Sequence, residues 1–143
     1  HPNIARVFDA GQTTRGTPYF AMEYVAGVAI TKYSEQHALP LAGKLQLLIS
    51  ACQAIHHAHQ KGIVHRDIKP SNILVSHQDG GPLLKIIDFG IARAVEDAGL
   101  DTLGTNFGSF VGTIAYMSPE QTAHDTSQLD TRSDVYSLGV LAY

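Results

Sequence analysis

The chain has 143 residues, of which 44% are hydrophobic and 16% charged, and its formal net charge is -3. This length suits one modest domain with a core, the composition argues against extended disorder, and the charge gives no electrostatic basis for binding nucleic acid or an anionic membrane. The single cysteine, Cys52, cannot form an intrachain disulfide, which fits a reducing, cytoplasmic compartment.

The N-terminal residues predict two short strands and a connector. Apolar patterns at residues 4–9 and 18–24 indicate the strands, and the glycine-containing stretch 11–16 indicates the turn between them. The β pattern stops at the sequence YVAG, which Gly27 breaks, so residues 24–27 are interpreted as a connector.

A long amphipathic helix is predicted from Leu41 onward, with Gly62 as its C-terminal cap. Apolar residues recur there at spacings of three and four, which is the pattern of one helix face. The expected buried stripe consists of Leu41, Leu45, Leu48, Cys52, Ile55 and His59.

The second half of the chain alternates short apolar runs with polar loops. Three runs have the length of strands, at residues 63–64, 73–75 and 83–87. The sequence DGGP at 79–82 predicts a turn between the last two runs, and the richness of residues 96–111 in Gly, Ser and Thr predicts a loop there. We expect Pro119 to begin a short helix and a buried helix to begin near Asp134, which together give an α+β layout.

Both ends of the chain look interrupted. His1 is not a natural start, and the final apolar pattern, DVYSLGVLAY, stops inside a predicted helix. No apolar run approaches the roughly 20 residues that span a bilayer, and no signal peptide opens the chain. We therefore expect a fragment cut at both ends, with any membrane anchor or targeting signal outside it.

Charged and amide side chains gather in two loops that follow apolar runs. Asp67 follows the sequence IVHR, and Asp88 follows LLKII, so strands could deliver both carboxylates to a common edge. Asn72 adds a neutral oxygen that suits Mg²⁺, and Lys69 adds a cation that suits phosphate. This combination predicts chemistry on a metal-bound phosphate.

Five motifs, in the same order along the chain, resemble those of eukaryotic-like protein kinases, and their sequences are most similar to those of bacterial serine/threonine kinases. They are MEYVAG (22–27), HRDIKPSN (65–72), DFG (88–90), SPE (118–120) and SDVYSLGV (133–140). The resemblance covers essentially the whole chain and implies a truncated protein-kinase-like α+β fold. Residues 1–24 would be the end of the small β lobe, and residues 25–143 the hinge and an incomplete helical C-lobe.

The resemblance implies ATP-dependent phosphoryl transfer to Ser/Thr hydroxyls of proteins. Asp67 would orient the substrate hydroxyl, and Lys69 would neutralise the transferred phosphate. Asn72 and Asp88 would hold Mg²⁺, with Mn²⁺ as an alternative, on the ATP phosphates.

The resemblance also implies roles for residues around these loops. Adenine would contact the backbone of Glu23 and Val25, with Met22 behind it and Leu74 beneath it. A second set would support the site: His65, Phe89 and Val7 in a buried apolar stack, Asp134 bracing the catalytic loop, and Thr113 near Asp67.

The segment from Asp88 to Glu120 resembles an activation segment. Arg66 and Arg93 would clamp its phosphorylated form, and Thr102 or Thr105 would carry the phosphate. The usual partner of Glu120 would lie beyond the last residue of the chain.

Several parts that the family requires are absent from this sequence. It contains no G-x-G-x-x-G motif, and we expect the glycine-rich loop, the strand lysine and the helix glutamate to lie upstream of His1. We therefore expect the fragment alone to be inactive. We expect this domain to be cytoplasmic, and the longer protein could be anchored to a membrane by a segment outside the fragment. The resemblance also allows a dimer of that longer protein for autophosphorylation. The alternatives are a pseudokinase that acts as a binding or scaffold module and a small-molecule phosphotransferase of the same fold.

Two other patterns are near matches to known sites. Residues 11–16 have the glycine spacing of a P-loop, but Thr17 stands where lysine is required, so a plain turn is favoured. Cys52, His56 and His59 share one helix stripe and could bind zinc, but no second ligand cluster accompanies them.

Overall fold

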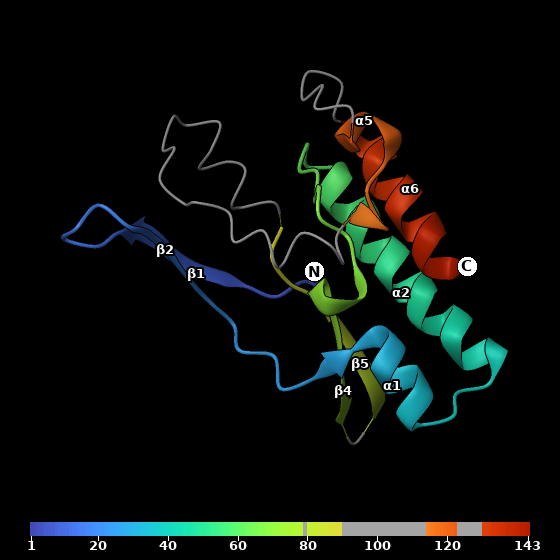
Figure 1. Cartoon of the computed structure of the whole chain (residues 1–143). Coiled ribbons are helices and arrows are strands. Elements are labelled where there is room, and N and C mark those ends of the chain that lie inside the picture. The colour runs from blue at the N-terminus through green and yellow to red at the C-terminus, as the bar shows by residue number, and fades with distance from the viewer. Residues whose placement is uncertain (79, 90–113, 123–129) are drawn as a thin grey trace.

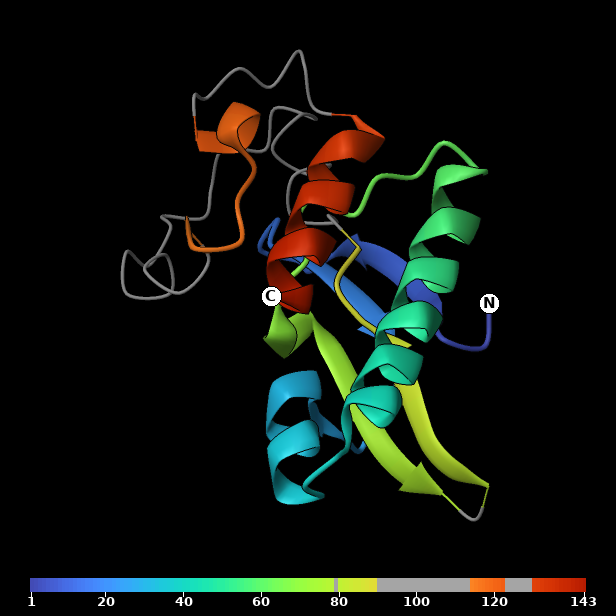
Figure 2. The ribbon, with the colours of Figure 1, turned by 90° about the vertical axis from the view of Figure 1, so that its right-hand side faces the viewer.

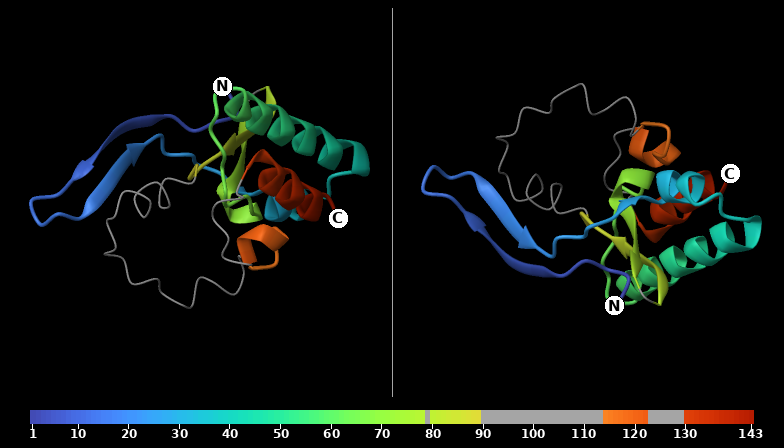
Figure 3. Two further views of the ribbon diagram at one scale, coloured as in Figure 1. Left: turned by 90° about the horizontal axis from the view of Figure 1, so that it is seen from above. Right: turned by 90° about the horizontal axis from the view of Figure 1, so that it is seen from below.

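The computed structural model describes residues 1–78, 80–89, 114–122 and 130–143. A three-stranded sheet and the helices around it form the body, from which a two-stranded hairpin extends (Figures 1 and 3). Among the described residues, no helix combines the length and apolar character needed to cross a membrane.

The hairpin consists of β1 (Val7–Gln12) and β2 (Pro18–Met22), paired antiparallel with Val7 opposite Met22. Two strands were predicted here, but the first begins three residues later than expected. Residues 3–5 instead lie beside Ile86, whose N–H donates to the Asn3 carbonyl at 2.9 Å and whose carbonyl accepts from Ala5 at 2.9 Å. Ile4 is thereby packed against the core rather than paired in the hairpin.

The central sheet has the order β3–β4–β5, formed by Val28–Ala29, Ile73–Gln78 and Gly81–Ile86. The two predicted strands at 73–75 and 83–87 are confirmed, whereas residues 63–64 form no strand. The connector before β3 is confirmed. A Cβ atom on Gly27 would lie 2.9 Å from the backbone of Val75, so this glycine lets the chain pass close to β4.

Two helices pack on this sheet. The helix α1 (Ile30–Gln36), which the sequence patterns did not indicate, contacts β3 and β4, and α2 (Leu41–His59) contacts β5 and α6 (Figure 2). The cap at Gly62 is confirmed: its φ is 73°, and the N–H of Ile63 donates to the Ala58 carbonyl at 3.0 Å.

The predicted buried stripe of α2 is only partly correct: Ile55 is buried and Leu48 packs against the core, but three other members of the stripe are exposed. Leu41 is 72% exposed, Leu45 is 47% exposed and Cys52 is also exposed. The buried face lies to one side of the predicted stripe and consists of Leu47, Ala51, Ala54, Ile55 and Ala58. Leu41 and Leu45 lie outside this face.

The C-terminal elements are α5 (Pro119–Thr122) and α6 (Thr131–Ala142). Pro119 begins its helix as expected, but α6 begins three residues before Asp134. The carboxylate of Asp130 caps α6 by accepting the N–H of Arg132 at 2.7 Å. The buried face of α6 is mostly polar and consists of Ser133, Asp134, Ser137 and Leu138.

Candidate active site

The loop between α2 and β4 is held by a buried carboxylate on α6. Asp134 is 1% exposed and accepts the backbone N–H groups of His65 and Arg66, each at 2.8 Å. It also accepts the Nε2–H of His59 at 2.7 Å. One side chain therefore fixes the start of the loop, and the contribution of His59 was not foreseen from the sequence.

The loop brings Asp67, Lys69 and Asn72 together. The ammonium of Lys69 lies 2.8 Å from Oδ2 of Asp67. The amide of Asn72 donates to the same oxygen at 2.9 Å and to the backbone carbonyl of Asp67 at 2.9 Å. The short helix η1 (Pro70–Asn72) makes this approach possible, because it turns the chain back within one 3₁₀ turn. The Asp67 carboxylate is thus oriented by a cation and an amide.

Asp88 follows β5 beside this loop. The N–H of Ile87 donates to the carbonyl of Asn72 at 2.9 Å, which places the end of β5 next to the end of η1. Asp88 is exposed and has a φ of 57°, a left-handed conformation that is uncommon for a residue other than glycine. Such strain is typical of functional loops.

His65 forms the floor of the loop and is fully buried. Its Nε2–H donates to the Ile87 carbonyl at 3.0 Å, and its Nδ1 accepts the N–H of Asp67 at 3.2 Å. Burial lowers the pKa of His65 and outweighs the opposing charge of Asp134, so the ring is neutral. The ring packs on Phe89 with centroids 4.6 Å apart, but Val7, expected in the same stack, is 51% exposed on β1.

The expected adenine-binding residues lie where β2 leads into β3. Met22 ends β2, Glu23 and Val25 lie in the connector, and Leu74 is half-buried on β4 opposite Lys85. Oε1 of Glu23 lies 2.7 Å from Nζ of Lys85. The hydrogen bond from Lys85 holds the pKa of Glu23 below its usual value. This ion pair links the connector to β5 and was not predicted.

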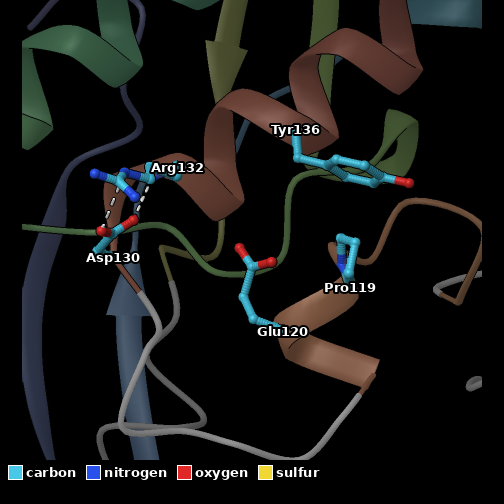
Figure 4. Close-up of a pocket in the computed structure, with 5 residues that line it drawn as sticks. All are labelled: Pro119, Glu120, Asp130, Arg132 and Tyr136. Carbon is cyan, nitrogen blue, oxygen red and sulfur yellow. Dashed lines mark hydrogen bonds and ion pairs between the residues drawn. The ribbon is translucent and has the colours of Figure 1, made fainter.

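Glu120 on α5 faces α6 rather than the loop. Its carboxylate accepts the hydroxyl of Ser133 at 2.6 Å, and this hydrogen bond lowers the pKa of Glu120. A pocket of about 590 Å³ opens between α5 and α6, where the Glu120 carboxylate lies between the Asp130–Arg132 pair and the Tyr136 ring (Figure 4). Its lining includes none of the residues around Asp67.

The adjacent residue, Gln121, points toward the loop. Its amide donates to the Arg66 carbonyl at 2.6 Å, a contact that no sequence pattern indicated. The other residues predicted for the activation segment are not part of the described structure, and they are Arg93, Thr102, Thr105 and Thr113.

In the described structure, no group of three or more His, Cys, Asp or Glu side chains could hold a metal ion. The zinc alternative on α2 therefore has no support there, and His59 is engaged with Asp134. The stretch 11–16 ends β1 and turns into β2 instead of preceding a helix, which supports the plain turn over the P-loop.

The chain was compared with known proteins, and a family model described as "Protein kinase domain" matches residues 1–143. Serine/threonine-protein kinase PknB of Mycobacterium leprae is 42% identical over 147 residues, covering 100% of this chain and 22% of that protein. PknB of Mycobacterium tuberculosis is 43% identical over 148 residues, with the same coverage of 100% and 22%. The chain therefore spans about a fifth of the length of these relatives.

Solved structures give the same likeness. The crystal structure of the Mycobacterium tuberculosis PknI kinase domain matches with a TM-score of 0.71 and 28% sequence identity. The match covers 99% of this chain and 49% of that kinase domain.

Proposed function

The chain belongs to the protein kinase domain family, and from this premise we propose that the full-length protein transfers the γ-phosphate of ATP to serine and threonine hydroxyls of proteins. The proposal concerns the full-length protein because the chain covers only 22% of the length of the related PknB protein. The observation that carries it is the Asp67 carboxylate, whose Oδ2 contacts both Lys69 and Asn72.

Asp67 would orient the attacking hydroxyl and accept its proton. A carboxylate can do this only if it is held in one direction, and the two contacts at Oδ2 provide that restraint. Because the side chain is 36% exposed, a substrate hydroxyl can reach it. Lys69, next to the same oxygen, would neutralise charge on the transferred phosphoryl group.

Asn72 and Asp88 would hold Mg²⁺, and the donor set fits that ion. The Nδ2 of Asn72 is used on Asp67, which leaves the oxygen of the same amide turned toward Ser71, whose hydroxyl lies 3.5 Å away. Mg²⁺ in such sites takes one or two protein oxygens and completes its shell with phosphate oxygens and water, so Asn72 and Asp88 suffice. When bound, the ion neutralises the phosphate charge.

The adenine ring would bind against the connector between β2 and β3. The backbone of Glu23 and Val25 would supply hydrogen bonds, and Met22 and Leu74 would supply apolar contacts. The Glu23–Lys85 ion pair supports this role because it holds the connector against β5.

Residues 1–143 alone are expected to transfer no phosphate. The sequence has no glycine-rich phosphate-binding loop, and strands β1 and β2 pair only with each other in the described structure. The loop around Asp67 would then lack part of the nucleotide-binding site.

The test uses the purified full-length protein with ATP, Mg²⁺ and a peptide mixture containing Ser, Thr and Tyr acceptors. Mass spectrometry should find phosphate on Ser and Thr, and none should appear when Mg²⁺ is chelated. A parallel reaction contains a small-molecule alcohol as the acceptor, and phosphate on that alcohol with none on the peptides would contradict the proposal. ATP binding without transfer would also contradict it and would favour a pseudokinase binding module.

A further inference from the structure

Gln121 on α5 is buried, with 6% of its surface exposed, and both ends of its amide are engaged. The Nε2 group donates to the Arg66 carbonyl at 2.6 Å. The Oε1 atom accepts the backbone N–H of Ser118 at 3.0 Å and its hydroxyl at 3.2 Å. The partners fix the direction of the amide, because an N–H can only donate and a carbonyl can only accept.

The Arg66 carbonyl belongs to a strained residue of the loop that contains Asp67. Arg66 has a φ of 67°, a left-handed conformation that is strained in a residue with a side chain. Its N–H is held by Asp134 at 2.8 Å, and its carbonyl is held by Gln121. Two separate elements, α6 and α5, therefore restrain the backbone on either side of its α carbon.

The peptide group that Gln121 holds leads directly into Asp67. Its carbonyl end accepts from Gln121 at 2.6 Å, and its N–H end donates to Nδ1 of His65 at 3.2 Å. Because both ends are bound, the plane of this peptide is fixed. The direction of the bond from its nitrogen to the α carbon of Asp67 is therefore fixed as well. Loss of the Gln121 amide would remove this restraint on the carbonyl end.

We propose that Gln121 is a positioning residue for Asp67: its amide locks the peptide between Arg66 and Asp67 and couples α5 to the catalytic loop. This inference rests on the proposed function for its effect on turnover, but its geometric part can be measured without activity. Gln121 acts through Asp67 and does not contact substrate.

The first experiment compares Gln121→Met with the wild type in the full-length protein, and Gln46→Met is the control. Methionine has nearly the same volume as glutamine but cannot hydrogen-bond the Arg66 carbonyl, and Gln46 is an exposed residue of α2. Turnover should fall about 10–100-fold in Gln121→Met. KM for ATP should stay within about twofold, because the change affects orientation and not nucleotide binding. Gln46→Met should behave like the wild type.

A double-variant cycle separates positioning from a general loss of structure. If Gln121 acts through Asp67, adding Gln121→Met to Asp67→Asn should cause no further loss of the residual turnover. An equal fold loss in both backgrounds would show a structural role and would overturn the inference.

Hydrogen exchange tests the geometry even if the protein transfers no phosphate. The N–H of Asp67 should exchange faster in Gln121→Met than in Gln46→Met, and a peptide from the centre of α2 should exchange equally in both. Unchanged exchange at Asp67 would contradict the inference. If the wild type transfers no phosphate but the N–H of Asp67 exchanges faster in Gln121→Met than in Gln46→Met, the proposed function is overturned and the geometric coupling is established.

Discussion

The side-chain amide of Asn72 donates to both the carboxylate and the backbone carbonyl of Asp67, at 2.9 Å in each case. One nitrogen thus ties the loop to itself across five residues, and the oxygen of the same amide would bind the proposed metal. Asn72 would therefore join two tasks that phosphoryl transfer requires: orienting the base and binding the ion.

We predict that Asn72→Ala raises the Mg²⁺ concentration needed for half-maximal turnover by about 10–100-fold, because a ligand of the ion is removed and Asp67 loses its amide partner. Steady-state rates across a Mg²⁺ titration measure this. The matched control is Asn3→Ala, which removes a hydrogen bond to the Leu84 carbonyl and leaves Asp67 untouched. An identical Mg²⁺ dependence in Asn72→Ala and Asn3→Ala would remove Asn72 from the metal site.

Asp134→Asn should destabilise the full-length protein by about 1–3 kcal/mol. The carboxylate accepts from His59, His65 and Arg66 in a buried position, and an amide would turn an N–H₂ group toward at least one of these donors. Urea unfolding measures the change, with the exposed Asp9→Asn as control. Equal midpoints for the two variants would contradict the bracing role.

The ion pair between Glu23 and Lys85 predicts a dependence of stability on pH. Because the pKa of Glu23 is lowered in the folded state, its charged form stabilises the fold above its ordinary pKa of 4.5. This stabilisation is lost as the pH falls through the lower folded value. The difference in Tm between the wild type and Glu23→Gln should therefore be present at neutral pH and shrink below pH 4.5. A difference that stays constant over this range would show that the pair does not act through charge.

The observed packing of α2 can be tested directly. Ile55→Ala should cost about 2–5 kcal/mol, because Ile55 is 2% exposed in the core. Leu41→Ala should change stability by less than about 0.5 kcal/mol, because Leu41 is 72% exposed. Denaturant unfolding of both variants in the full-length protein decides between the observed face and the stripe expected from the sequence, which would make both changes costly.

Local sequence was enough to place the centre of the candidate site. Asp67, Lys69 and Asn72 lie within six consecutive positions, so a single 3₁₀ turn brings them together. Asp88 lies beside them because of the hairpin of β4 and β5, whose strands were predicted from apolar runs. The turn was expected at 79–82, but Gly81 and Pro82 are already part of β5.

The other contacts around the site, and the start of β1, depend on residues far apart in the sequence, which the periodicity of apolar residues does not reveal. Gln121 meets Arg66 across 55 residues, and Lys85 meets Glu23 across 62 residues. The spacing of three and four in α2 favoured a stripe through Leu41, Leu45 and Cys52, whereas the buried face runs through Ala51 and Ala54, because alanine contributes little to a hydrophobic pattern. The start of β1 was misjudged because Ile4 pairs with Ile86, far along the chain, and not with the hairpin.

The most direct test of the central claim is the single-turnover rate of phosphoryl transfer in full-length protein carrying Asp67→Asn, measured beside the exposed control Asp9→Asn. We expect Asp67→Asn to slow transfer by about 10²–10⁴-fold while ATP still binds, because the base is lost and the nucleotide contacts remain. Transfer at the wild-type rate in Asp67→Asn would contradict the assignment of Asp67 as the residue that orients and deprotonates the acceptor hydroxyl.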